Sequence, residues 1–87
     1  MPSDYPPPRS AAALGDAIRT LREEQQITVE ELAAATGLSP GQLAALEAGR
    51  LDPGCELLVL IAGGLGVQVA ALLERAAESV ASARLDV

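Results

Sequence analysis

An 87-residue chain has room for one domain, and the apolar half of its residues, mostly Ala and Leu, is sufficient for a compact helical core. The chain has no His, no glycine-rich phosphate loop and no cluster of metal ligands, so we expect no enzyme and no cofactor; its single Cys and the lack of a membrane-length apolar run favour a cytoplasmic protein. The formal net charge of -6 repels phosphate overall, so nucleic-acid binding would require a local basic patch.

Residues 1–10 hold four of the six prolines, which predicts an extended, disordered tail; the alternative is a Pro-rich ligand for another domain. We expect residues 11–87 to form one all-α domain that ends in an extended helix, because strand formers are sparse and no stretch alternates apolar and polar residues. Five helices are predicted, at residues 11–25, 29–35, 40–48, 55–63 or 55–65, and 69–83.

The second and third predicted helices each begin with a capping box, in which a Ser or Thr precedes a Glu or Gln by three residues. Thr28 and Glu31 form the first box, and Ser39 and Gln42 form the second. Gly37 lies between the two helices and suits a left-handed cap. Two short helices joined by so short a turn make a helix-turn-helix.

The spacing of residues between Leu14 and Arg75 resembles that of the phage repressor/Cro (XRE-like) family over about 60 residues without a gap. The segments that carry the resemblance are Leu14–Arg19, Leu21–Glu24, Thr28–Ala33, Thr36–Ser39, Leu43, Leu46–Glu47, Gly49–Arg50, Pro53, Leu58, Ile61–Ala62 and Leu65–Val67. The resemblance implies a five-helix repressor-like domain that forms a homodimer, places its third helix in the major groove of double-stranded DNA and regulates transcription.

The positions that the resemblance assigns to DNA contacts are Thr28, Val29, Ser39, Gln42, Ala45 and Arg50. Gln42 could hydrogen-bond an adenine edge, and Ala45 could touch a thymine methyl group. For Ser39 and Gln42, the equal alternative to a DNA contact is a role only in capping the helix. For Arg50, the equal alternative is a charged loop residue that is exposed to water and contacts no DNA. Val29 is better interpreted as a helix-start residue without a partner.

The third helix also departs from the family pattern. Pro40, Gly41 and Ala45 stand where the family commonly has polar side chains that read bases, and none of the three has a side-chain donor. The positions where polar or basic phosphate contacts are frequent in the family hold Ala48, Asp52 and Cys55. These departures and the acidic charge favour an alternative function, a helix-turn-helix used to bind a protein partner with weak or lost DNA reading. Cys55 is interpreted as a small core residue rather than a nucleophile.

Two further features concern structure and assembly. In the family, the residues matching Arg22 and Glu47 often form a partly buried ion pair that joins the first helix to the end of the third, so we expect a salt bridge rather than a DNA contact. The fourth helix carries a second apolar face besides its core stripe, and the fifth helix extends the apolar surface, which suggests that a partner covers them. The predicted homodimer interface consists of Leu57, Leu60, Gly64 and Val80.

Overall fold

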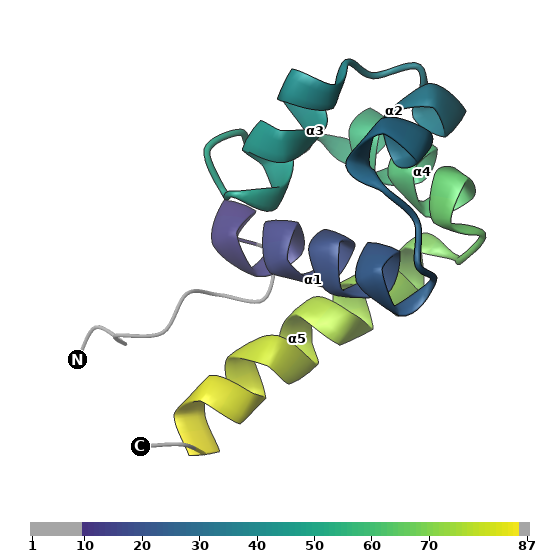
Figure 1. The fold of residues 1–87 in the computed structure, drawn as a ribbon. Helices are drawn as coiled ribbons and strands as arrows, with labels where there is room; N and C mark the ends of the chain where they lie inside the picture. The colour runs from purple at the N-terminus through teal and green to yellow at the C-terminus, as the bar shows by residue number, and fades with distance from the viewer. Residues whose placement is uncertain (1–9, 86–87) are drawn as a thin grey trace.

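The computed structural model describes residues 10–85, without the side chains of residues 79 and 81–85. Five helices occupy this part of the chain, which contains no strand, so the predicted all-α fold is confirmed (Figure 1). The helices are α1 (Ala11–Glu24), α2 (Val29–Thr36), α3 (Pro40–Glu47), α4 (Cys55–Leu65) and α5 (Val69–Leu85). The disordered Pro-rich tail is predicted for residues 1–10, of which residues 1–9 lie outside the described residues and Ser10 caps α1.

The helix ends follow from local hydrogen bonds that the sequence encodes. Both predicted capping boxes are present, so the backbone N–H groups left open at the starts of α2 and α3 have side-chain acceptors. Ser10 caps α1 by accepting a hydrogen bond from the Ala13 N–H at 3.1 Å. Gly37 ends α2 in the left-handed conformation, with a φ of 78°. Each observed boundary lies within two residues of the predicted one.

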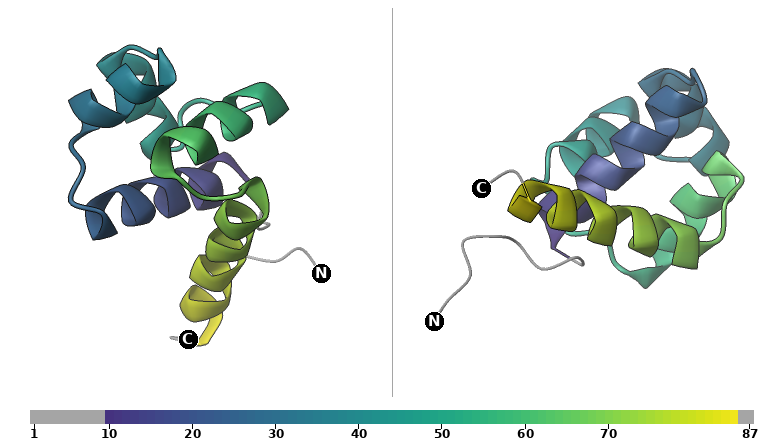
Figure 2. Two further views of the ribbon diagram at one scale, coloured as in Figure 1. Left: turned by 90° about the vertical axis from the view of Figure 1, so that its right-hand side faces the viewer. Right: turned by 90° about the horizontal axis from the view of Figure 1, so that it is seen from below.

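The core is aliphatic, as expected for a chain with a single aromatic residue. α1 packs against α3 and α5, while α2 packs against α3 and α4, and the C-terminal half of α5 projects beyond the other helices (Figures 1 and 2). The largest side chains that are fully buried belong to Ile18, Leu32, Leu43, Leu46, Ile61 and Leu72. Every helix contributes at least one of them, so the five helices share one core.

Two glycines set the distances between helices. A Cβ on Gly15 would lie 2.2 Å from the carbonyl oxygen of Leu46, so the backbones of α1 and α3 touch directly. A Cβ on Gly64 would lie 2.8 Å from Thr36 Cγ2 and 3.0 Å from Leu32 Cδ1, so α4 approaches α2 closely at this point. Both positions therefore need a residue without a side chain for the helices to pack as they do.

Polar contacts tie the end of α1 to the C-terminal part of the domain. Gln25 donates from Nε2 to the carbonyl oxygen of Leu65, at 2.7 Å, and Arg75 on α5 forms an ion pair with Glu24. In residues 10–85 no single helix is long and apolar enough to cross a membrane, and α4 with the first part of α5 reaches that length only as a pair bent by 95°.

Candidate nucleic-acid interface

The helix-turn-helix consists of α2, the turn at residues 37–39, and α3. The turn is held by the N–H groups of Gly37 and Leu38, which both donate to the carbonyl oxygen of Ala33, at 2.9 and 3.1 Å. Thr36 donates its hydroxyl to the carbonyl oxygen of Leu32, at 2.9 Å, and is buried. These bonds fix the direction in which the chain leaves α2, so the start of α3 is presented to solvent in one orientation.

The outer side of α3 is composed mainly of small residues. Pro40, Gly41 and Gln42 are exposed, while Leu43 and Leu46 on the opposite side are fully buried. A Cβ on Gly41 would meet only Ser39 Oγ, at 4.0 Å, so the surface here is open. Gln42 is thus the long polar side chain on the exposed first turn of α3.

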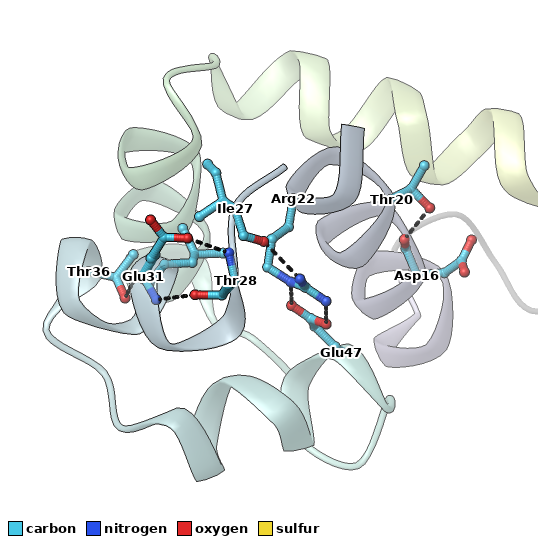
Figure 3. A network of polar contacts seen from close by, with 9 residues as sticks. Asp16, Thr20, Arg22, Ile27, Thr28, Glu31, Thr36 and Glu47 are labelled. Atoms are coloured by element: carbon cyan, nitrogen blue, oxygen red, sulfur yellow. Dashed lines mark hydrogen bonds and ion pairs between the residues drawn. The ribbon is translucent and has the colours of Figure 1, made fainter. Parts of the chain in front are cut away.

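The capping roles proposed for the polar candidates are confirmed. Ser39 Oγ accepts from the Gln42 N–H at 3.1 Å, and Gln42 Oε1 accepts from the Ser39 N–H at 3.0 Å. Thr28 Oγ1 accepts from the Glu31 N–H at 3.0 Å, and Glu31 Oε1 accepts from the Thr28 N–H at 2.9 Å (Figure 3). Hydrogen bonds from the backbone and hydroxyl of Thr28 lower the pKa of the Glu31 carboxyl below its ordinary value. A DNA role for Thr28, Ser39 and Gln42 stays a prediction.

The apolar candidates lie partly inside the molecule. Val29 is half-buried and packs against the core, and its interpretation as a helix-start residue without a DNA partner stays a prediction. It lies at the first position of α2, beside the other core residues of that helix. Ala45 is half-buried on α3.

Three of the four Arg side chains that the structure describes are paired with carboxylates. Among the described Arg residues, Arg19 pairs with Asp16, Arg22 with Glu47 and Arg75 with Glu24. Arg50 forms no ion pair with any described residue, and it is exposed in the loop that follows α3. Its backbone N–H donates to the carbonyl oxygen of Ala45, at 2.9 Å, which fixes the loop against the end of α3. Arg50 is therefore the described cation with the fewest competing interactions for a phosphate.

The predicted ion pair between Arg22 and Glu47 is present and joins three elements (Figure 3). Arg22 donates from Nε to Glu47 Oε2 at 2.7 Å and from Nη2 to Glu47 Oε1 at 3.0 Å, while Nη1 donates to the carbonyl oxygen of Ile27 at 2.9 Å. The two side chains are only 13% and 8% exposed. The hydrogen bond to Glu47 raises the pKa of Arg22 above its ordinary value. This group fixes the end of α3 to α1 and to the segment before α2, and both side chains are largely buried.

Residues 18–72 match the helix-turn-helix family, and this range covers both helices of the motif and the core around it. The chain belongs to the helix-turn-helix family. It is 37% identical over 60 residues to the immunity repressor protein of Bacillus phage phi105. The matched segment covers 69% of this chain and 42% of the repressor. The predicted membership in the phage repressor (XRE-like) group is therefore confirmed, although this helix-turn-helix chain spans less than half the length of that relative.

Solved structures of other regulators share the fold. The clp gene regulator ClgR from Corynebacterium glutamicum superposes with a TM-score of 0.82 at 42% identity, covering 94% of this chain and 87% of ClgR. The restriction-modification controller protein C.AhdI from Aeromonas hydrophila superposes with a TM-score of 0.69 at 22% identity, covering 71% of this chain and 94% of the controller. These relatives are described as repressor or regulator proteins, in agreement with the prediction that this helix-turn-helix protein is not an enzyme.

The outer face of α4 differs in detail from the predicted second apolar face. Leu60 is 47% exposed, as expected for that face, but Leu57 is half-buried against the core. Gly64 contacts α2 within the same chain, and Val80 is half-buried against the core. Val59, which is 59% exposed, was missed. The exposed glycine with open space around it is Gly63, not Gly64.

A shallow apolar groove of about 440 Å³ continues this face toward α5. Its walls include Pro53 before α4, Leu58 and Val59 on α4, and Val69 and Leu73 on α5. Cys55 also lines the groove and is exposed, so the expectation of a core cysteine is wrong. The physical reason is that Cys55 is the first residue of α4 and precedes the buried residues of that helix.

Proposed function

We propose that this chain is a DNA-binding transcriptional regulator that docks α3 in the major groove of double-stranded DNA as a homodimer. The observation that carries the proposal is the presentation of α3, whose first turn is exposed while its other side and its end are fixed by Leu43, Leu46 and the buried Arg22–Glu47 pair. A rigidly held helix with an open N-terminal half is the geometry used for major-groove reading. The matches to repressor and regulator proteins support the same function.

The candidate contacts fall into two groups: those that would position the protein on the DNA backbone and those that would read the bases. Arg50 is proposed to contact a phosphate, because it is exposed and has no ion pair within the described residues. Thr28 and Ser39 retain hydroxyl hydrogens that can be donated to phosphate oxygens beside their capping role. Gln42 and Ala45 are proposed to face the bases, and Val29 would contribute only its backbone N–H at the start of α2. So few positive groups predict a modest affinity.

The homodimer is proposed to form through α4 and α5, with Leu60 near its centre. Leaving Leu60 and Val59 in water forgoes about 1.5–3 kcal/mol for each side chain relative to full burial. Two copies related by a two-fold axis would bury both residues and the neighbouring groove in a self-complementary patch. Of the other interface candidates, Leu57 and Val80 could add only their exposed parts. Of the two adjacent glycines Gly63 and Gly64, only Gly63 has the open space that another helix would need for a close approach.

Selection of bound sequences from a random pool of double-stranded DNA tests this proposal most directly. A DNA-binding dimer is expected to enrich two half-sites about one helical turn apart, and its affinity should fall as salt rises. Failure to enrich any sequence at low salt, by a protein shown to be folded and dimeric, would overturn the proposal. DNA binding would also place the chain in the cytoplasm.

A second candidate function is a protein-interaction module that keeps the helix-turn-helix fold without DNA reading. The observation that favours it is the lack of side-chain donors at Pro40 and Gly41 on the exposed start of α3, together with the net charge of -6. Its partner would be a protein that contacts this small-residue surface. A folded chain that enriches no DNA, but whose complex with a partner is lost on placing Arg at Gly41, would favour this function.

A further inference from the structure

The first turn of α3 offers one side chain whose hydrogen-bonding direction is fixed by the fold. Gln42 is exposed, and its Oε1 accepts from the Ser39 N–H at 3.0 Å. A backbone N–H can only donate, so the amide atom that faces it must be the carbonyl oxygen. The capping box therefore determines which end of the Gln42 amide points back to the helix start.

The other end of this amide is a free donor. Nε2 carries two hydrogens and has no hydrogen-bond partner among the described residues. It cannot take the place of Oε1 at the Ser39 N–H, because both groups are donors. The side chain thus has a fixed acceptor turned toward its own helix and an unpaired donor available to a ligand at the same exposed turn.

Each base edge in the major groove presents a different order of donors and acceptors. A two-bond contact with adenine needs Oε1 to accept from N6 while Nε2 donates to N7, so the one oxygen would have to serve both the Ser39 N–H and the base with its two lone pairs. Guanine presents two adjacent acceptors, N7 and O6, and thymine presents the acceptor O4. Guanine can accept both Nε2 hydrogens and thymine O4 accepts one, whereas adenine offers a donor only N7, which lies beside its own N6 donor.

We propose that Gln42 selects a major-groove acceptor, guanine N7/O6 or thymine O4, by donating from Nε2 while Oε1 stays in the capping box. This inference rests on the proposed DNA-binding function and differs from the expected adenine contact, which stays untested. Ala45 lies three residues further along α3, and its methyl group could touch a thymine methyl beside the same contact.

The chain itself indicates a variant that separates reading from capping. In the other capping box, Glu31 fills the position equivalent to Gln42, and its Oε1 accepts from the Thr28 N–H at 2.9 Å. Gln42→Glu is therefore expected to keep the bond to Ser39 while it removes the Nε2 donor. A carboxylate can accept from cytosine N4, so the selected base should change to cytosine.

The experiment compares the full chain with Gln42→Glu and with the matched control Glu31→Gln in the same random-pool selection, after circular dichroism and thermal melting of each. Wild type should enrich guanine or thymine at one position of each half-site. Gln42→Glu should lose that preference by roughly tenfold and gain cytosine there, whereas Glu31→Gln should leave the base preference unchanged. Replacing the selected guanine by 7-deazaguanine, or the selected thymine by uracil, separates the two acceptors and the methyl contact.

Three outcomes would count against the inference. An enriched adenine at the position that responds to Gln42→Glu would overturn it, and so would an unchanged preference with a uniform loss of affinity. If Gln42→Glu does not fold, Gln42→Ala is evaluated in the same selection, and retention of the wild-type preference overturns the proposal. A wild-type chain that enriches no DNA fails the proposed function itself, which is distinguishable from all of these results.

Discussion

Arg22 and Glu47 lie 25 residues apart in the chain and meet through two parallel hydrogen bonds, at 2.7 and 3.0 Å. Removal of one partner leaves a largely buried charge without compensation, which is costlier than the loss of the attraction itself. We expect Glu47→Ala to lower the free energy of unfolding by about 3 kcal/mol in urea titrations. Arg19→Ala, which breaks an exposed pair, should cost less than about 1 kcal/mol. Equal effects of the two changes would show that burial does not matter here.

The two neighbouring glycines of α4 should respond in opposite directions to Ala. A Cβ on Gly64 would lie 2.8 Å from Thr36 Cγ2, and Thr36 is held by its own hydrogen bond to Leu32, so it cannot turn away cheaply. Gly64→Ala should therefore destabilise the fold by about 1–3 kcal/mol. Gly63 has open space around it, so Gly63→Ala should stabilise α4 by up to about 1 kcal/mol. Thermal melting of both variants at one protein concentration checks this pair.

The proposed dimer makes a prediction about Leu60. Leu60→Glu would place a carboxylate at the centre of the two-fold contact, so sedimentation velocity should show a folded monomer. Leu51→Glu is the matched control, because Leu51 is also exposed, at 43%, but lies in the loop after α3. That variant should remain dimeric. A wild-type chain that sediments as a monomer at high concentration would contradict the proposed interface.

Arg50 should act on DNA affinity without acting on sequence preference. Arg50→Ala is expected to weaken binding to all sequences alike and to reduce the dependence of log affinity on log salt by about one unit, because one phosphate contact is lost. Titrations at several salt concentrations measure both quantities. Arg19→Ala serves as the control, since Arg19 is already paired with Asp16. Unchanged binding by Arg50→Ala would remove Arg50 from the interface.

The ion pair between α1 and α5 predicts a response to acid. The hydrogen bond from Arg75 lowers the pKa of Glu24 below its ordinary value of 4.5. The contribution of this pair to stability is thus present above that value and is lost as the pH falls through the lowered pKa of the folded state. In Arg75→Met the Glu24 carboxyl should titrate closer to its ordinary value, as followed by NMR, and the stability should fall less on acidification. An unchanged titration of Glu24 would show that Arg75 does not lower the pKa of Glu24 when the protein is in solution.

Local rules account for most of what the sequence predicts correctly. The boxes at Thr28 and Ser39 depend on residues three positions apart, so the starts of α2 and α3 could be predicted without any knowledge of packing. The pair of Arg22 and Glu47 spans 25 residues, and it was predicted only because the chain resembles a known family.

The side of α4 that faces solvent could not be predicted in the same way. Residues 57–60 are all apolar, so the pattern has no polar residue to indicate which side faces water. The packing of α4 decides it, because Leu58, Ile61 and Leu65 are buried in the core and Val59 and Leu60 are left exposed. The direction of the Gln42 amide likewise emerged only from the hydrogen bond to Ser39.

The direct contact of Gly15 with the backbone of α3 separates the residues that hold α3 in place from the residues on its outer side, and protein engineers could use this separation. Because a Cβ at Gly15 would lie 2.2 Å from Leu46 O, the backbone of α3 rests directly on α1, on the side away from its exposed residues. The residues on that outer side, such as Gly41, meet little of the rest of the molecule. A library that varies exposed positions such as Gly41 and keeps the capping residues Ser39 and Gln42 should therefore yield many folded proteins that present different surfaces on the same helix.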